Sequence, residues 1–322
     1  MIHVALSADK AYTVPLALCL HSMVQTAAPG TEYHFHILDS GVDRALVERG
    51  HFKHLTWYNV EEELRELPQS PRYPTSIYHR YLLPRIIPAE IDRIFYLDCD
   101  TQVLEDLSDL FHSDLKGHPM AAAPWEVLGH YREEYGQYIR NFPSRFELPD
   151  DGTPYFYSSQ LLMDLNAMRA MNATAGLIEL TEKYTRALIW PDQDVLNAYF
   201  RGNILSLPLR YNVIPLFANQ LENESAEAEE AFAHPAIIHF AATKPNILTG
   251  PRNEMETAFF LLWQQSPWKR EIPYPLISLA YMPRPVARLL NTVFKALIPF
   301  PSLLHLLGKG LAAIRKLTRK EA

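Results

Sequence analysis

The stretch Arg93-Ile-Phe-Tyr-Leu-Asp-Cys-Asp-Thr101 decides the fold, because it ends an apolar run in two carboxylates. Alternate side chains of a strand share a face, so Asp98 and Asp100 are predicted to turn to the same side at the carboxyl end of a strand. Two carboxylates placed in this way suit a divalent metal that bridges two phosphates. An acidic junction between a strand and a loop explains the pair equally well, so this segment alone leaves both interpretations open.

The amino terminus has the pattern of a strand followed by a helix. An apolar run from His3 stops at Asp9, and a helix-like stretch then runs from Tyr12 toward Ala28. Open α/β sheets place ligand-binding groups at the carboxyl ends of their strands. The sequence contains neither a G-x-G-x-x-G fingerprint nor a G-x-x-x-x-G-K-[ST] loop. Asp9 is therefore predicted to hold a base or a ribose rather than a pyrophosphate.

Two later segments add polar groups of the same kind. Trp190-Pro-Asp-Gln-Asp194 opens a periodic apolar stretch, and its proline suits a first helical turn. Asp192 and Asp194 in that turn either bind a ligand or only favour the helix dipole. Further on, an apolar run delivers His239, and Lys244 follows it. A lone histidine there is usually a core residue, but a histidine and a lysine downstream of an Asp-x-Asp pair suit a metal ligand and a phosphate-neutralising group.

In order, these segments resemble the retaining glycosyltransferases of family 8, which have a GT-A nucleotide-sugar fold. The likeness is greatest to bacterial enzymes that add galactose or glucose to lipopolysaccharide or lipooligosaccharide core. The motifs that carry it, between Ile2 and about Pro245, are Ala8-Asp9 with Tyr12, His36-Ile-Leu-Asp39, Ser76-Ile-Tyr-His-Arg80, Tyr96-Leu-Asp-Cys-Asp100, Tyr155 to Leu165, Asp192-Gln-Asp-Val-Leu-Asn197, Tyr211-Asn212, and His239 with Lys244-Pro245.

The resemblance implies an α/β chain with a GT-A, Rossmann-like fold and a mostly parallel central sheet. It implies transfer of a hexose from a UDP-sugar to a saccharide or glycolipid acceptor, with no nucleic-acid partner. Mn²⁺, or Mg²⁺ in its place, would be held by Asp98, Asp100 and His239. The catalytic residues would be Gln193 and Asp192. The donor-binding residues would be Ala8, Asp9, Tyr12, Arg80, Asp98, Cys99, Asp100, Ser158, Asp192, Gln193 and Lys244.

Retention of configuration normally needs a carboxylate nucleophile on the far face of the sugar. The residue implied to lie near the anomeric carbon is Gln193, and an amide is a poor nucleophile. We therefore expect front-side attack, in which the leaving diphosphate accepts the proton of the acceptor and Gln193 stabilises the oxocarbenium-like centre.

Two positions depart from the family pattern. Tyr157 stands where the family usually has an asparagine that touches the donor sugar, and this leaves the identity of the sugar open. The closing motif of the family has a glycine three residues after the histidine and a lysine six residues after it. Here the corresponding residue is Ala242, and Lys244 comes one residue early.

Composition fits an enzyme of this kind. A chain of 322 residues that is 48% hydrophobic is long enough to bury one large α/β core with a small appendage. Two cysteines do not make a disulfide framework, and the amino terminus lacks the basic region of a signal peptide. We expect a catalytic domain over residues 1–265, a helical segment over 266–322, and a cytoplasmic location.

The last part of the chain is basic and amphipathic. Apolar residues recur at helical spacing on either side of Pro299-Phe-Pro301, opposite basic residues. This pattern predicts two helices that lie peripherally on an anionic membrane surface; the alternative is that they pack on the enzyme's own core. From Arg284 onward the chain has one acidic residue, Glu321, and the basic residues Arg284, Arg288, Lys295, Lys309, Arg315, Lys316, Arg319 and Lys320.

Two other classes of function share parts of the pattern. Asp98-Cys-Asp100 is similar to the D-x-D-x-T motif of aspartyl-phosphate hydrolases, but Gln102 replaces the expected threonine or valine. A non-catalytic protein that binds a nucleotide sugar and partners another transferase is the second alternative, because the segment around Tyr157 is altered. Manganese-dependent release of UDP, without phosphate, from a UDP-sugar distinguishes an active transferase from both.

Overall fold

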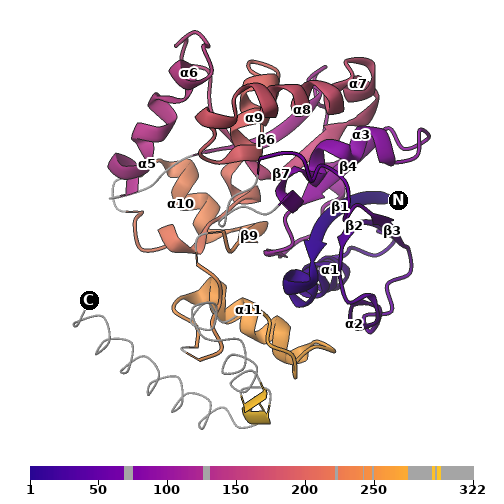
Figure 1. Cartoon of the computed structure of the whole chain (residues 1–322). Coiled ribbons are helices and arrows are strands. Elements are labelled where there is room, and N and C mark those ends of the chain that lie inside the picture. The colour runs from indigo at the N-terminus through magenta and orange to yellow at the C-terminus, as the bar shows by residue number, and fades with distance from the viewer. Residues whose placement is uncertain are drawn as a thin grey trace.

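The structure is a computed structural model, and it describes residues 1–68, 75–125, 131–221, 224–241, 243–248 and 250–274, with 292–293 and 296–298 (Figure 1). Within these residues the strands are β1 (Ile2–Asp9), β2 (Tyr33–Ser40), β3 (Leu55–Asn59), β4 (Arg93–Leu97), β5 (Thr101–Val103), β6 (Met120–Pro124), β7 (Phe156–Asp164), β8 (Ile204–Ser206) and β9 (Ile237–His239).

The α-helices are α1 (Thr13–Thr26), α2 (Arg44–Glu48), α3 (Leu83–Ile86), α4 (Ser108–Phe111), α5 (Tyr131–Arg140), α6 (Phe142–Arg145), α7 (Leu165–Ala170), α8 (Ala173–Lys183), α9 (Pro191–Tyr199), α10 (Ala226–Ala233) and α11 (Glu254–Gln265). The 3-10 turns are η1 (Lys10–Tyr12), η2 (Thr75–Leu82), η3 (Thr185–Ala187), η4 (Leu209–Tyr211) and η5 (Pro215–Phe217).

The central sheet has seven strands in the order β3-β2-β1-β4-β7-β6-β8. The β3–β2, β2–β1, β1–β4 and β6–β8 pairs are parallel, whereas β7 runs antiparallel to both of its neighbours. The predicted α/β class with a mostly parallel sheet is therefore confirmed. Because β1 and β4 are adjacent and parallel, their carboxyl ends lie side by side, and the residues that follow them meet there.

Helices cover both faces of this sheet (Figure 1). On one face, α1, α2, α4 and α11 pack on the buried side chains of β1 and β2. On the other, η2, α3, α7, α8 and α9 pack on the opposite sides of β1, β4 and β7. Alternation along β1 shows why: Val4, Leu6 and Ala8 contact the first layer, and Ala5 contacts the second.

A second, two-stranded sheet is formed by β5 and β9. The strands are antiparallel, and Thr101 pairs with His239. Phe240 N–H donates to the carbonyl of Asp100 at 2.9 Å. This small sheet brings a residue from late in the chain against the end of β4.

Helix boundaries differ in part from the sequence-based expectation. The apolar periodicity of the sequence predicts helices over 171–188 and 195–200, whereas α8 ends at Lys183 and α9 begins at Pro191, so the first turn of α9 includes Asp192 and Gln193. Packing on the core continues past residue 265, because Trp268 is fully buried. Of the predicted carboxyl-terminal helices, most residues lie outside those described, but Leu297 and Ile298 are partly buried against the core. No helix in the described ranges is both long and apolar enough to cross a membrane.

Candidate active site

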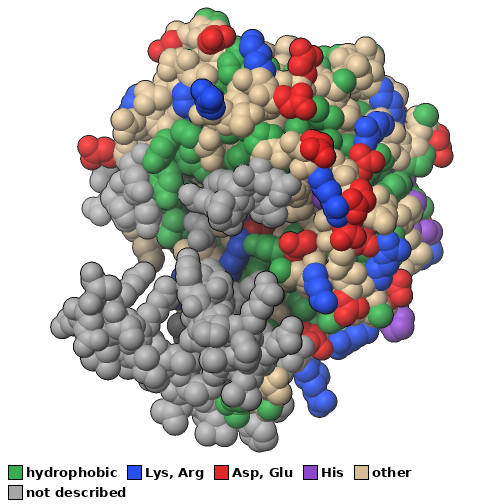
Figure 2. Space-filling model, viewed as in Figure 1, with side chains coloured by type: hydrophobic (Ala, Val, Ile, Leu, Met, Phe, Trp, Pro, Cys, Tyr) green, Lys and Arg blue, Asp and Glu red, His purple; other side chains and the backbone are tan. Residues whose placement is uncertain are grey.

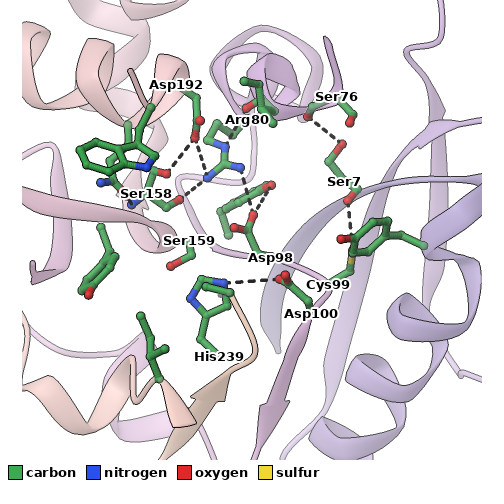
Figure 3. A pocket seen from close by; sticks show the side chains of 18 of the residues that line it. Ser7, Ser76, Arg80, Asp98, Cys99, Asp100, Ser158, Ser159, Asp192 and His239 are labelled. Atoms are coloured by element: carbon green, nitrogen blue, oxygen red, sulfur yellow. Dashed lines mark hydrogen bonds and ion pairs between the residues drawn. The ribbon is translucent and has the colours of Figure 1, made fainter. Parts of the chain in front are cut away.

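A cavity of about 480 Å³ opens at the carboxyl ends of β1 and β4. Its walls come from the end of β1, from η2, from the turn after β4, from the start of β7, from α9 and from the segment after β9 (Figure 3). All of the predicted site residues line it: Ala8, Asp9, Tyr12, Arg80, Asp98, Cys99, Asp100, Ser158, Asp192, Gln193, His239 and Lys244. The structure thus brings together residues that lie up to 236 positions apart between Ala8 and Lys244.

Asp98, Asp100 and His239 form a group in which one ligand atom of each residue lies within 4.8 Å of the others. Asp98 N–H donates to the carbonyl of Ser159 on β7 at 2.8 Å, which fixes the backbone where β4 ends. His239 Nε2 lies 3.4 Å from Asp100 Oδ1. Two carboxylates and one imidazole are a donor set that suits Mn²⁺ or Mg²⁺, so the residues present fit such an ion.

The two carboxylates differ in their electrostatic surroundings. Burial alone would raise the pKa of Asp100, but Lys244 and His239 outweigh it, and the pKa lies well below its usual value. Lys244 pairs with Asp100 and also donates to the carbonyl of Phe240 at 2.6 Å. For Asp98, burial dominates and raises the pKa, although the positive charge of Arg80 opposes this. Asp100 is thus firmly ionised.

Asn212 orients His239. Its side-chain oxygen lies 3.0 Å from His239 Nδ1. With the Nδ1–H donated to this oxygen, His239 Nε2 faces Asp100 and would offer its lone pair to a bound ion, the arrangement typical of a metal-ligating histidine. The sequence motif Tyr211-Asn212 marked this position, but it gave the asparagine no role.

Arg80 connects two parts of the site (Figure 3). Its guanidinium lies 3.0 Å from Asp98 Oδ1 and 3.2 Å from Asp192 Oδ2, and it also donates to the carbonyl of Ser158. The side chain is buried over the ring of Tyr96, at 4.5 Å from the centroid. Although burial disfavours the charge, Asp192 and Asp98 raise the pKa of Arg80, so the cation is held permanently in the cavity wall.

The first turn of α9 carries Asp192 and Gln193 into the cavity. Ser158 on β7 holds both: its hydroxyl donates to Asp192 Oδ2 at 2.8 Å, and its N–H donates to Gln193 Oε1 at 3.2 Å. Asn197, one turn further along α9, makes paired hydrogen bonds with the backbone of Phe156 at 2.7 and 2.8 Å. These contacts fix the position of the helix end against β7.

Asp194, unlike its neighbour two residues earlier, points away from the cavity. Its carboxylate is fully buried and accepts hydrogen bonds from Arg145 at 3.0 Å and from Tyr155 at 2.7 Å. It also accepts from the N–H groups of Ile189 and Trp190. Asp194 therefore stabilises the start of α9. Of the two interpretations that the sequence left open, ligand binding or a structural role at the helix terminus, the structural role is nearer to what Asp194 does.

Asp9 and Tyr12 line the cavity where β1 ends and η1 follows. Asp9 Oδ1 accepts from the N–H groups of Ala11 and Tyr12 at 2.9 and 3.1 Å, so one of its oxygens caps η1. The ring of Tyr12 is half-buried, and burial together with Asp100 raises the pKa of its hydroxyl well above the usual value. Lys244 Nζ lies 5.9 Å from the centroid of this ring.

An aromatic wall completes the cavity, and sequence reasoning did not identify it. Trp125 and Trp190 meet edge to face with centroids 4.2 Å apart, and Tyr157 lies 5.7 Å from Trp125. Tyr138 on α5 packs against Trp190 at 5.2 Å. Figure 2 shows apolar side chains gathered around α5 on this face of the molecule. Aromatic faces of this kind suit the C–H faces of sugar rings.

Comparison with known proteins agrees with this geometry. Residues 3–245 match the model of glycosyl transferase family 8. A lipopolysaccharide 1,2-glucosyltransferase of Escherichia coli is 26% identical over 286 residues, covering 83% of this chain and 78% of that protein. General stress protein A of Bacillus subtilis (strain 168) is 24% identical, covering 83% of this chain and 95% of that protein.

Two solved structures are similar in fold. The galactosyltransferase LgtC, in complex with donor and acceptor sugar analogs, superposes with a TM-score of 0.66 at 22% identity, covering 81% of this chain and 95% of that one. The apo structure of the bifunctional glycosyltransferase WbbM gives a TM-score of 0.68 at 20% identity, covering 83% of this chain and 50% of that one. The expected GT-A fold is thereby confirmed.

Proposed function

The chain belongs to glycosyltransferase family 8, and we propose that it transfers a hexose, galactose or glucose, from a UDP-sugar to a saccharide acceptor with retention of configuration. The relatives named for lipopolysaccharide glucosyl transfer support a lipopolysaccharide core or another cell-surface glycan as the acceptor. The observation that carries the proposal is the convergence of Asp98, Asp100 and His239 with two cations, Arg80 and Lys244, in one cavity.

The charges in the cavity fit a diphosphate. Arg80 and Lys244 are each paired with a carboxylate, and both line the cavity. Asp98, Asp100 and His239 would hold the divalent ion, which when bound supplies positive charge to the diphosphate leaving group. Arg80 and Lys244 would neutralise the phosphate charge that remains.

The remaining contacts divide between base and sugar. Tyr12 would stack on the uracil ring, and Asp9 would accept hydrogen bonds through the carboxylate oxygen that does not cap η1. Ala8 and Cys99 form the floor beside them. Asp192, fixed by Ser158 and Arg80, would accept hydrogen bonds from hydroxyls of the donor sugar.

Front-side attack is the mechanism that these residues favour. The bond between the anomeric carbon and the diphosphate breaks, and the acceptor oxygen bonds to the same face of that carbon. The proton of the acceptor hydroxyl passes to the leaving diphosphate oxygen. Gln193, held by Ser158 N–H, would direct its amide dipole at the positive centre without bonding to it.

The aromatic wall of Trp125, Tyr157 and Trp190 is proposed as the acceptor-facing side. These rings line the same cavity as Tyr12, and their faces suit a sugar ring that presents C–H groups. Tyr157 occupies the position at which the family usually has asparagine. Its bulk and its aromatic face would select which hexose and which acceptor fit together.

We also propose that the enzyme acts at the cytoplasmic face of a membrane, where a lipid-linked acceptor is found. The catalytic domain of residues 1–265 would be followed by a segment, 266–322, whose basic residues attract anionic lipid. Trp268, near the start of that segment, is buried against the core.

The proposal is tested with a panel of UDP-galactose, UDP-glucose and UDP-N-acetylglucosamine, each incubated with the enzyme and Mn²⁺. We expect UDP to be released from a hexose donor without inorganic phosphate. Release of phosphate would indicate a phosphohydrolase. Binding of UDP without release of sugar from any donor or to any saccharide acceptor would indicate a non-catalytic partner protein.

A further inference from the structure

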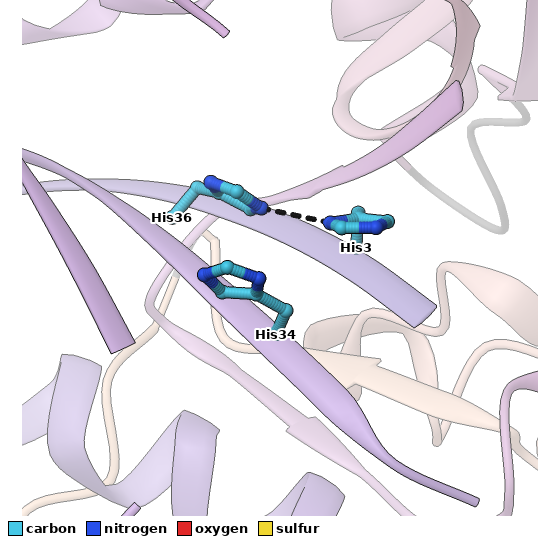
Figure 4. Close-up of side chains that lie close together, drawn as sticks. All are labelled: His3, His34 and His36. Atoms are coloured by element: carbon cyan, nitrogen blue, oxygen red, sulfur yellow. Dashed lines mark hydrogen bonds between the residues drawn. The ribbon is translucent and has the colours of Figure 1, made fainter. Parts of the chain in front are cut away.

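Three histidines lie together at the amino ends of β1 and β2, at the far end of the strands that carry the active site (Figure 4). His3 on β1 pairs in register with His34 on β2, and His36 is two residues further along the same strand. Alternation puts all three side chains on one face of the sheet. The six residues from His3 to Asp9 span about 20 Å of extended strand, so this cluster is separate from the cavity.

The ligand nitrogens of the cluster are close together. One nitrogen of each histidine lies within 4.8 Å of the other two. His3 Nδ1 is 3.0 Å from His36 Nε2, and the rings of His34 and His36 are stacked with centroids 4.3 Å apart. His36 is 1% exposed, whereas the other two are partly exposed, so the group is open to solvent on one side.

The outer nitrogens of two of these rings are held by hydroxyls from β3. His36 Nδ1 lies 3.0 Å from Tyr58 Oη, and His34 Nε2 lies 2.8 Å from Thr56 Oγ1. In the tautomers that donate these N–H groups to the hydroxyls, His36 Nε2 and His34 Nδ1 carry the lone pairs. A histidine that binds a metal characteristically donates its other ring N–H to an oxygen in this way.

The protonation of the cluster also suits a metal. Burial lowers the pKa of His3 and His34 and brings that of His36 to about 3, so the rings are neutral at pH 7. Neutral imidazole is the form that coordinates metal. If His3 carries its proton on Nε2, its Nδ1 lone pair and that of His36 Nε2 point into the same space. Replacing the hydrogen bond between them by two metal bonds then needs only a tautomer shift on the partly exposed His3.

We propose that His3, His34 and His36 form a binding site for a borderline transition-metal ion such as Zn²⁺, distinct from the Asp-x-Asp site. Three imidazoles and one solvent-facing position give the four-coordinate geometry that Zn²⁺ takes, with Zn–N distances of about 2.0–2.1 Å. The His34 ring must turn out of its stack on His36 to complete this geometry. The all-nitrogen donor set separates this site from the oxygen-rich one, since imidazole favours Zn²⁺ and carboxylate favours Mn²⁺ or Mg²⁺.

The test uses the full chain without a polyhistidine tag, titrated with Co²⁺ alone. Tetrahedral Co²⁺ absorbs visible light much more strongly than six-coordinate Co²⁺. The spectrum therefore distinguishes the histidine site from the site formed by Asp98, Asp100 and His239. We expect one equivalent of tetrahedral Co²⁺ per chain, displaced by Zn²⁺. Zn²⁺ in large excess over its Kd should raise Tm by roughly 4 °C or more.

Variants locate the ion. His34→Asn and His3→Asn should each remove the tetrahedral spectrum, and far-ultraviolet circular dichroism checks that they fold. Tyr58→Phe and Thr56→Val should keep the stoichiometry but weaken affinity about 10–100-fold, as loss of an outer-shell partner does. This graded effect is not expected of a purely structural hydrogen bond.

Matched controls are His112→Asn, at an exposed histidine on another surface, and Asp98→Asn in the cavity. Both should leave the tetrahedral spectrum unchanged. Absence of that spectrum in the wild type, or its persistence in folded His34→Asn, overturns the proposal. Its loss in Asp98→Asn would place the ion in the cavity and overturn the proposal equally.

Discussion

At the carboxyl ends of β1 and β4, charged side chains are packed in pairs of opposite sign, whereas at the amino ends of β1 and β2 three imidazoles lie together with hydroxyl partners. Arg80 is shared by two carboxylates, and Lys244 and His239 keep Asp100 ionised although it is buried. At the other end, burial keeps His36 neutral. The same sheet thus presents a charged, oxygen-rich end and a neutral, nitrogen-rich end.

This difference follows from where the strands lead. The carboxyl ends run into turns and helix starts, where backbone N–H groups and side chains from several segments converge on carboxylates. At their amino ends β1 and β2 pair in parallel register. The side chains that meet there are those that the register and the alternation of the two strands place on the same face of the sheet. The first arrangement suits a charged diphosphate, and the second suits a small ion that prefers nitrogen.

The strongest test of the charged end is removal of a carboxylate. Asp98→Ala or Asp100→Ala should lower turnover by at least about 10³-fold, because the diphosphate charge loses its compensation. Steady-state transfer assays at saturating Mn²⁺ measure this, with Asp150→Ala at an exposed site as the control. Turnover near that of the wild type in either variant would contradict the role of these residues as metal ligands.

Gln193 gives the next largest effect. Gln193→Ala should retain measurable turnover, reduced about 10²–10³-fold, as for loss of one preorganised dipole. A nearly complete loss, or a sugar found on Gln193 by mass spectrometry of the intact enzyme, would mean that a covalent intermediate forms. Either result would replace front-side attack by a double displacement.

A variant of Asn212 tests how much the orientation of the His239 ring matters for metal binding. Asn212→Ala frees the His239 ring, so the Mn²⁺ concentration for half-maximal activity should rise about 10–100-fold. The kcat at saturating Mn²⁺ should change little, and Asn203→Ala, at an exposed asparagine, is the control. A lower kcat that added Mn²⁺ does not restore would show that Asn212 acts on something other than the metal ligand.

Sequence alone was sufficient for the parts that rest on local patterns. Strand-end carboxylates such as Asp98 and the proline-led start of α9 are readable from a few consecutive residues, and the ordered motifs pointed to the cavity that collects them. The antiparallel direction of β7 was not readable, because a buried strand has the same composition in either direction.

Contacts between residues far apart in the sequence could not be predicted either. The His-x-His pattern of His34 and His36 was visible on β2, but its third member, His3, joins only through the β1–β2 register. Asn212 and His239 likewise meet across 27 positions. Trp125 and Trp190 meet through the packing of separate loops. Contacts of this kind depend on the tertiary fold, which no local window contains.

A smaller effect concerns acid stability near the charged end. His79 lies under β1 with Nδ1 at 3.1 Å from Ser7 Oγ, and burial, followed by the charge of Arg80, lowers its pKa to about 4. Between pH 6.5 and 4 the unfolded chain binds a proton that the folded chain does not. The contribution of neutral His79 to the free energy of unfolding is therefore fully present above pH 6.5 and is lost as pH falls to 4, by about 3 kcal/mol in total.

Urea unfolding at pH 7.0 and 5.0 measures this contribution. His79→Gln should be less stable than the wild type at pH 7 but should lose less stability on acidification. His112→Asn, whose ring is exposed, should keep the slope of the wild type. Equal slopes for His79→Gln and the wild type would place the acid-sensitive groups elsewhere, with the imidazoles at the amino ends as the next candidates.

The smallest effect on turnover is expected from the end of the chain. Among the residues that the structure describes, those that line the cavity lie before Pro245, and Leu297 and Ile298 pack on the core. Truncation after Ile298 should therefore leave hydrolysis of the UDP-sugar unchanged. It removes five basic residues and one acidic residue, so binding to anionic vesicles should fall, since each basic residue near such a surface contributes about 1 kcal/mol. Co-sedimentation with anionic vesicles at low and high salt measures this binding, because screening weakens the attraction of the intact chain.

Equal binding by the intact and truncated chains would show that this segment is no membrane anchor. An insoluble truncated chain would show that the segment packs on the catalytic domain instead.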